Sequence, residues 1–116
     1  MDIQEIKKKL RQFAAEREWD QFHSPKNLTM ALAGETGELL EIFQWLSEEQ
    51  SQKICDTEKG RHKVEEEVAD IAIYLIRLCD KLGIDLQLAI ADKIKTNEQK
   101  YPVNLSRGNA KKYNER

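Results

Sequence analysis

Two pairs of acidic residues with helical spacing are the strongest chemical signal in the sequence. Glu35 and Glu38 lie in GETGELLEIFQW, and Glu67 and Asp70 lie in EEEVADIAIYLIRL, so the members of each pair are three positions apart. This spacing brings both members to one side of an α-helix. In each segment that side borders the apolar face, where an uncompensated carboxylate is costly. The spacing therefore predicts carboxylates held at a helix–helix contact.

Four converging carboxylates require a positive partner. If the two helices pack antiparallel, mutual repulsion and desolvation raise the pKa values of the acids or unfold the site. Oxygen ligands without thiolate or imidazole favour Mg²⁺, for which Mn²⁺ can substitute, over Zn²⁺. Because Mg²⁺ also binds substrate phosphates, the acids indicate a metal site that activates water for an attack on a phosphate-bearing substrate.

Two other interpretations of the acids compete with a magnesium site. Glutamates on helices are usually solvated, so the chain could be a non-catalytic helical assembly protein. Two acidic pairs, each beside an apolar face, count against this. A di-iron bundle requires E-x-x-H on two helices. Neither His23 nor His62 follows a glutamate at that spacing, so we set the di-iron site aside.

The elements that position the acids are predicted to be four long helices. Apolar residues recur at helical spacing over about residues 2–16, 27–46, 62–82 and 86–100. Residues 47–61 are polar, end near Gly60 and are interpreted as a connection with room for one short helix. The expected fold is an all-α four-helix bundle, and the small size of the chain favours assembly with partner subunits.

Capping residues mark the ends of these helices. Ser24 and Asn27 supply an N-cap for the second helix, and Pro25 supplies a turn beside them. Gly83 has the position that glycine favours after the end of a helix, and Asp85 is expected to cap the fourth helix.

Composition limits the classes of function. The 116 residues carry a net charge of −2, with 34% charged and 40% apolar residues, which is typical of one soluble helical domain. We treat residues 1–116 as a single domain whose end, from about 103 to 116, is a basic, partly flexible tail. The charge gives no reason to expect a nucleic-acid partner. Without a membrane-spanning run or a signal peptide, a cytoplasmic location is expected.

The acidic pairs and their flanking segments resemble a known family. G-E-x-G-E-L, 28 intervening residues after Glu38, and then E-x-x-D resemble the signature of the all-α, MazG-like nucleotide pyrophosphohydrolases. The segments FAAEREWDQFHSPKNL, DKIKTNEQKYP and KKY extend the resemblance, in its dCTP pyrophosphatase branch, over most of the chain. The resemblance implies Mg²⁺-dependent hydrolysis of dCTP or related and modified deoxynucleoside triphosphates to the monophosphate and pyrophosphate, which cleans the nucleotide pool. It also implies a homotetramer, a dimer of dimers with sites at subunit interfaces.

The resemblance further implies roles for individual residues. The four acids, Glu35, Glu38, Glu67 and Asp70, match the metal ligands of the family, and Glu38 is our choice of general base. Positions that match the nucleotide pocket or suit phosphate contact are Trp19, His23, Trp45, Tyr74, Lys93, Asn97, Tyr101 and Lys112. The aromatic residues would enclose the base and sugar. Core packing for the aromatics, a structural hydrogen bond for His23 and a solvated terminus for the tail remain the alternatives.

One position departs from the branch. Leu10 stands where the animal members carry a pocket histidine, and a leucine cannot donate a hydrogen bond to cytosine. Strict preference for dCTP is therefore in question, and a broader NTP or dUTP pyrophosphohydrolase is the alternative among enzymes. Gly34 and Gly37, on either side of Glu35, would allow close approach of a helix or a phosphate.

Overall fold

The computed structural model describes residues 2–111, and within them it contains helices and no strand. The elements are α1 (Ile3–Glu16), η1 (Asp20–Phe22), α2 (Pro25–Phe43), α3 (Glu48–Gln52), η2 (Ile54–Asp56), α4 (Glu58–Leu82), α5 (Leu86–Lys100) and α6 (Val103–Ser106). The predicted all-α class is confirmed, and each of the four long helices overlaps a segment in which the apolar periodicity predicts one.

Local sequence signals determine where these helices begin and end. Ser24 Oγ accepts a hydrogen bond from the Asn27 backbone N–H at 3.1 Å, so Ser24 is the N-cap of α2. Gly83 follows α4 with a φ of 68°, in the left-handed region that glycine adopts without strain. Asp85 Oδ1 accepts from the backbone N–H of Leu88 at 3.0 Å and caps α5. These predicted caps are confirmed.

The start of α4 differs from the prediction. The helix begins at Glu58, so Gly60 lies in its first turn instead of ending the connection. Thr57 Oγ1 caps the helix by accepting from the Gly60 N–H at 3.1 Å. A Cβ at Gly60 would lie 2.0 Å from the backbone oxygen of Ile54. This glycine therefore permits the close approach of η2 to α4, and it does not terminate a segment.

The connection between the two central helices is also more ordered than predicted. The second long helix ends at Phe43 and not near residue 46, and two short helices, α3 and η2, follow it where one was expected. Ser47 and Gln50 form a capping box at the start of α3, in which each side chain accepts from the other residue's backbone N–H.

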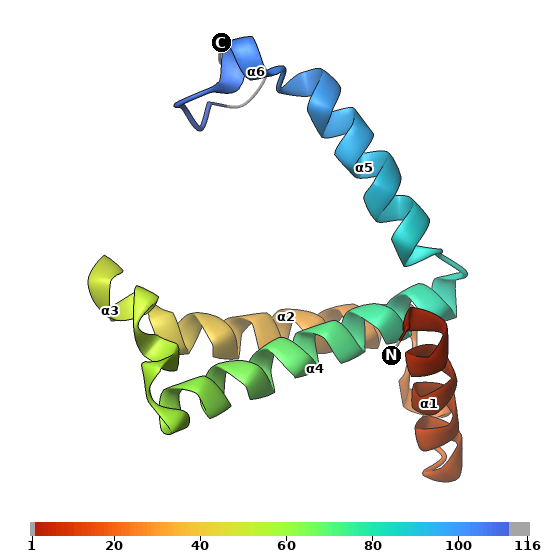
Figure 1. Cartoon of the computed structure of the whole chain (residues 1–116). Helices are drawn as coiled ribbons and strands as arrows, with labels where there is room; N and C mark the ends of the chain where they lie inside the picture. Colours follow the sequence, from red (N-terminus) through yellow and green to blue (C-terminus); the bar gives the residue numbers. More distant parts are fainter. Residues whose placement is uncertain (1, 112–116) are drawn as a thin grey trace. The chain divides into compact units, whose positions relative to one another are not determined.

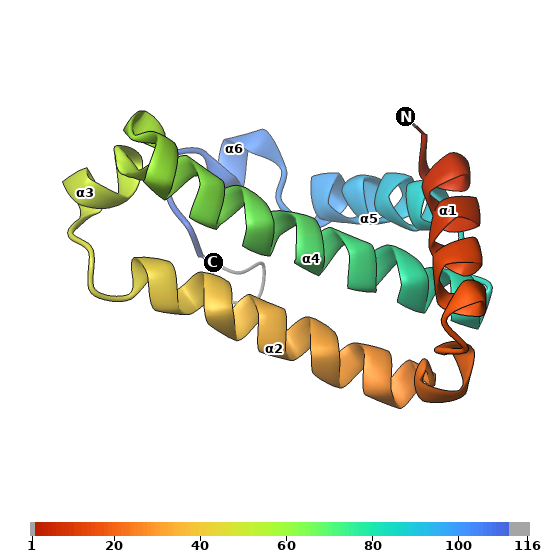
Figure 2. The same ribbon diagram turned by 90° about the horizontal axis from the view of Figure 1, so that it is seen from below.

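The chain divides into two compact units, Met1–Gly83 and Ile84–Arg116. In the first unit, α2 and α4 lie side by side and run in opposite directions, and α1 packs against α4 (Figures 1 and 2). The antiparallel packing that brings the acids together is thus present. The second unit consists of α5 and α6.

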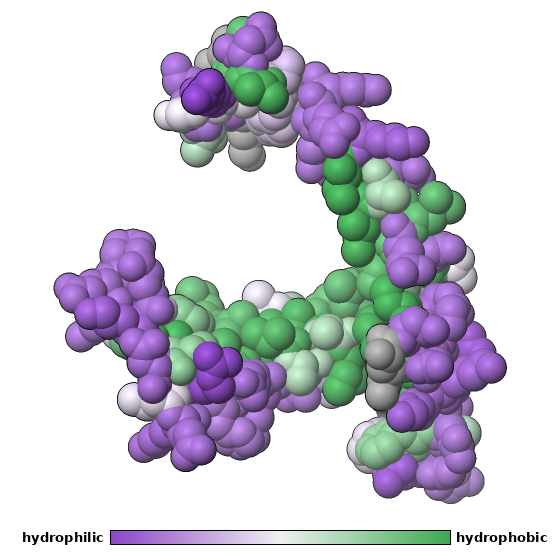
Figure 3. Space-filling model, viewed as in Figure 1, coloured by the Kyte–Doolittle hydropathy of each residue, from purple (hydrophilic) through white to green (hydrophobic). Residues whose placement is uncertain are grey.

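The first unit has a small core and an exposed apolar surface. Among residues 2–111, the buried apolar residues are Ala14, Leu28, Ile76 and Cys79. Hydrophobic residues form a band along α2 and α4 (Figure 3), and Met30 and Leu40 on α2 are 63% and 61% exposed. Apolar surface of this extent is typical of a subunit interface. None of the described helices has the length and apolarity needed to cross a membrane.

Candidate active site

Three of the four predicted metal ligands meet between α2 and α4. One carboxylate oxygen from each of Glu35, Glu38 and Glu67 lies within 4.8 Å of the other two. Glu35 and Glu67 are half-buried and Glu38 is exposed. Asp70 lies one turn beyond Glu67 on α4, outside this group of three. The acidic cluster, as we call these four residues, therefore has a tight part and one member at its edge.

Among residues 2–111, the acidic cluster has no side chain of positive charge in an ion pair with it, and its pKa values reflect this. Burial, followed by the neighbouring carboxyl groups of Glu35 and Glu38, raises the pKa of Glu67 to about 7. The interaction with Glu67 lowers the pKa of Glu35, but burial and the charges of Glu38 and Asp70 outweigh it and raise that pKa. Within residues 2–111, none of the ion pairs includes any of the four acids.

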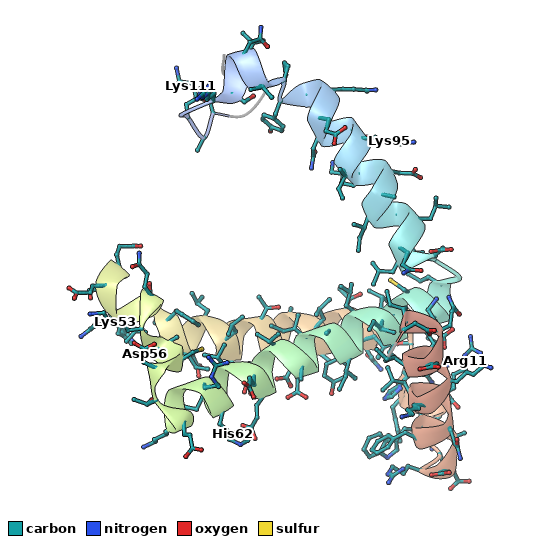
Figure 4. All side chains as sticks on the ribbon, in the orientation of Figure 1. Arg11, Lys53, Asp56, His62, Lys95 and Lys111 are labelled. Carbon is teal, nitrogen blue, oxygen red and sulfur yellow. The ribbon has the colours of Figure 1, made fainter. Side chains whose placement is uncertain are left out.

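The residues present fit a divalent cation. Glu35 Oε2 and Glu67 Oε2 are buried and have no hydrogen-bond partner, which is costly for a carboxylate unless a cation binds there. All ligands in the group are oxygens, the donor set of Mg²⁺ and Mn²⁺. His62, labelled in Figure 4, is exposed and pairs with Glu66 at 3.1 Å, so it does not join the cluster.

An aromatic cavity of about 350 Å³ adjoins the acidic cluster. Its lining includes three predicted pocket residues, Trp19, His23 and Tyr74, together with Asp70 of the acidic cluster and Leu10. Trp19 also makes an edge contact with Phe13, at 5.6 Å between ring centroids. Asp70 thus belongs to both features, which places a partly apolar cavity directly beside the carboxylates. The structure brings Trp19, His23 and Tyr74 together with Leu10, the position that departs from the family branch, and the binding roles of these residues remain predictions.

Of the other predicted binding residues, Trp45 belongs to the same unit as this cavity but does not line it. Trp45 follows α2 and is 85% exposed. Lys93 and Asn97 lie one turn apart on the exposed surface of α5, and Tyr101 is the C-cap of that helix. Lys112 lies outside the described residues. The binding roles of these five residues remain predictions.

A second cavity, of about 660 Å³, adjoins the acidic cluster at Glu38 and Glu67 and was not predicted. Glu38 and Glu67 line it together with two lysines, Lys59 and Lys63. The lysines are one turn apart on α4, and Lys63 is one turn before Glu67. That i, i+4 series was visible in the sequence, but lysines on a helix are most often ordinary solvated residues.

A buried arginine at the aromatic cavity was also missed. Arg77 is 4% exposed and lines the cavity with His23. It donates to Asp20 and, at 3.5 Å, to Asp80. Its Nε donates to His23 Nδ1 at 3.3 Å. The signal was present, because Arg77 continues the edge of α4 on which Glu67, Asp70 and Tyr74 recur every three or four positions.

Comparison with known proteins identifies the family of this chain. Over residues 31–115 the chain matches the model of the MazG-like family. The chain belongs to the MazG-like family. Membership implies a requirement for a divalent metal, and the acidic cluster supplies suitable ligands.

Curated relatives and a solved structure extend the comparison. This MazG-like chain is 46% identical to "dCTP pyrophosphatase 1" of Rattus norvegicus over 96% of its own length. It is 40% identical to the Homo sapiens protein of the same name over 97% of this chain. The chain spans 65% and 66% of the lengths of these two relatives. A crystal structure of a pyrophosphatase from Archaeoglobus fulgidus shares 43% identity with a TM-score of 0.79, covering 85% of this chain and 91% of that one.

Proposed function

We propose that this MazG-like protein hydrolyses deoxynucleoside triphosphates, dCTP and related or modified ones above all, to the monophosphate and pyrophosphate. The observation that carries the proposal is the contact between the acidic cluster and the aromatic cavity through Asp70. A nucleotide needs both features, because its base stacks on aromatic rings and its phosphates bind through a divalent cation. The names of the curated relatives and of the solved structure agree with this assignment.

The two cavities support one orientation of the substrate in the site. The base and sugar would lie in the aromatic cavity, against Trp19 and Tyr74, and the triphosphate would extend over the acidic cluster. Lys59 and Lys63 line the second cavity, where their positive charge would stabilise the departing pyrophosphate. The acidic cluster would then be located at the bond that breaks.

Each acid has a defined role in this mechanism. Mg²⁺, when bound, would neutralise phosphate charge and increase the acidity of water. Glu35, Glu67 and Asp70 would hold it, because two of them carry buried oxygens without partners and the third lies beside them. Glu38 is exposed towards the larger cavity and would contribute a ligand oxygen and accept the proton of the attacking water.

The remaining predicted residues complete the proposal at the level of the assembly. We propose a homotetramer, a dimer of dimers, in which the exposed band on α2 and α4 is buried. Trp45, Lys93, Asn97, Tyr101 and Lys112 would contact nucleotide in that assembly. We further propose that the two units act as one domain and that the enzyme cleans the cytoplasmic nucleotide pool. Light scattering after size exclusion tests the assembly: a monomer at micromolar concentration would contradict it.

A substrate screen tests the reaction. Canonical and modified NTPs and dNTPs are incubated with the protein and Mg²⁺, and pyrophosphate is measured separately from phosphate. We expect pyrophosphate and a nucleoside monophosphate in equal amounts, with dCTP among the best substrates. Release of single phosphates would contradict the reaction type. Equal rates with all bases would favour the broader NTP or dUTP activity.

Metal titration separates an enzyme from a non-catalytic assembly protein. Isothermal titration of Mg²⁺ should show binding by the wild type and its loss in Glu35→Ala and Asp70→Ala. Glu65→Ala, which removes an exposed acid of α4 that pairs with Arg61, is the matched control and should bind Mg²⁺ normally. Absence of binding by the wild type, or binding that survives both substitutions, would favour the assembly protein.

A further inference from the structure

The contact between Arg77 and His23 determines which hydrogen-bonding group the aromatic cavity can offer. We propose that Arg77 is a positioning residue that keeps the proton of His23 on Nε2, so that the cavity presents a fixed N–H donor to a base with a carbonyl acceptor. The nature of the ligand rests on the proposed function. The state of His23 does not, and it can be measured on the protein alone.

The chemistry of the two side chains decides which is the donor and which is the acceptor at this contact. Arg77 Nε lies 3.3 Å from His23 Nδ1. A guanidinium can only donate, because it has no acceptor atom and does not lose its proton in proteins. His23 Nδ1 must therefore accept through its lone pair. In a neutral imidazole the proton is then on Nε2, the remaining nitrogen of a ring that lines the cavity.

The surroundings of His23 favour the neutral ring. Burial, and after it the positive charge of Arg77, lower the pKa of His23 below its ordinary value. Asp20 opposes this shift and Lys81 supports it. Charged or titratable groups on the elements around His23 and Arg77 are Lys7 and Arg11 of α1, Asp20 of η1, and Asp70, Tyr74, Asp80 and Lys81 of α4. His23 is thus expected to remain neutral, with one defined tautomer, at neutral pH.

Arg77 is itself held rigidly. It donates to Asp20 on one side and to Asp80 on the other. Asp80 also accepts two hydrogen bonds from Arg11, at 2.5 and 2.7 Å, and Asp20 accepts from Lys81 at 3.1 Å. Because these bonds come from α1, η1 and α4, they fix the plane of the guanidinium and hence the direction of its Nε–H.

Removal of Arg77 has a distinctive consequence. In Arg77→Met, Asp20 and Lys81 are the remaining charges that act on His23, and of these the carboxylate of Asp20 favours a proton on Nδ1. The neutral ring would then offer a lone pair at Nε2, which repels a carbonyl oxygen of the base. At lower pH the ring gains a second proton and Nε2 donates again. The loss of nucleotide affinity in this variant should therefore be large at high pH and small at low pH.

Nitrogen NMR of the histidine rings tests the tautomer without any nucleotide. In the wild type we expect His23 Nε2 to carry the proton and Nδ1 to show the shift of an unprotonated nitrogen. In Arg77→Met, Nδ1 should carry the proton and Nε2 should show the shift of an unprotonated nitrogen. His62, exposed and distant in sequence, is the internal reference. A proton on Nδ1 of His23 in the wild type would overturn the proposal, and this measurement does not depend on a variant that folds.

Steady-state kinetics tests the consequence. For Arg77→Met we expect KM for the best nucleotide of the screen to rise about tenfold near pH 8, the effect of one hydrogen bond, with little change in kcat. The ratio of variant to wild-type KM should fall towards one near pH 6. This ratio cancels the titration of the acidic cluster, which both proteins share. A ratio that does not vary with pH would reduce Arg77 to a structural residue and overturn the proposal.

Two further variants separate positioning from general damage. Arg77→Lys retains a donor for Nδ1, so its KM should stay within about threefold of the wild type at all pH values. Arg61→Met removes an exposed ion pair with Glu65 on α4 and leaves the network around His23 intact, so its KM ratio should be near one and independent of pH. If the wild type released no pyrophosphate from any nucleotide, the proposed function would fail while the NMR result stood by itself.

Discussion

The helix pair α2–α4 and its neighbours carry two clusters of charge with opposite character. The acidic cluster contains four carboxylates and, within residues 2–111, no ion pair. The arginine cluster, Arg77 with Asp20, Asp80, Arg11 and Lys81, contains three cations and two carboxylates joined by hydrogen bonds. Both clusters border the same aromatic cavity, through Asp70 and Arg77.

The pKa shifts of the two clusters differ in sign for that reason. Burial and neighbouring carboxyls raise the pKa of Glu67, whereas the hydrogen bonds from Arg11 and from Lys81 lower those of Asp80 and Asp20. A cluster with its own counter-charges stabilises the fold and can orient a neighbour. A cluster without them requires a ligand of positive charge. This difference in counter-charge distinguishes the acidic cluster, a candidate metal site, from the arginine cluster, a structural network, without comparison with any relative.

The largest expected effect is on catalysis, at the uncompensated cluster. Glu38→Gln removes the proposed proton acceptor but keeps the size of the side chain, so turnover should fall by about 10²–10⁴-fold. The fold and nucleotide binding should persist, because Glu38 is exposed. Pyrophosphate release under substrate saturation measures this. An unchanged rate would reject Glu38 as the general base.

The next effect concerns stability and should have opposite signs in the two clusters. Asp80→Asn leaves the buried Arg77 with one carboxylate and should lower the free energy of unfolding by about 3 kcal/mol. Glu67→Gln removes a charge from a repelling group and should raise the stability of the metal-free protein. Urea unfolding with a chelator present, near pH 8, compares the two variants. Loss of stability in both would mean that the acidic cluster has counter-charges after all.

The pH dependence of the metal-free protein provides a third test. Glu67 has a folded-state pKa of about 7, above its ordinary value of 4.5. Between these values the folded state binds more protons than the unfolded state, so stability falls as pH rises through this window and the loss is complete above about 7. Thermal unfolding in a chelator should show the decline, and Glu67→Gln should reduce it. Added Mg²⁺ should raise Tm most at high pH, where the carboxylates are ionised; equal shifts at all pH values would contradict the assignment.

The smallest effect is expected at the rim of the arginine cluster. The side chain of Arg11 is 57% exposed, although its partner Asp80 is only 8% exposed. Arg11→Met should therefore lower the free energy of unfolding far less than Asp80→Asn does, because solvent screens the pair and Asp80 keeps Arg77. Urea unfolding of Arg11→Met and Asp80→Asn compares the loss of stability at the exposed edge of the arginine cluster with the loss at its buried centre. A loss as large as that of Asp80→Asn would place the stabilising contact at the surface.

Much of the molecule follows from local rules that one sequence reveals. Apolar periodicity determined the four long helices, and Ser24, Gly83 and Asp85 marked their ends, because capping depends on a few neighbouring backbone groups. The start of α4 was missed for a non-local reason. Gly60 is required by the backbone oxygen of Ile54, and no pattern in the sequence shows such an approach.

For the site, the sequence by itself predicted the two acidic pairs and a cation between them, because residue type and helical spacing fix which carboxylates share a side. The resemblance to the MazG-like family added Trp19, His23 and Tyr74. Only the tertiary structure decided that Asp70 joins the acidic cluster to the aromatic cavity, that lysines line the second cavity, and that Arg77 holds His23. Those facts depend on contacts between segments far apart in the chain, such as those that carry residues 23 and 77, and on which charges remain without a partner once the helices pack.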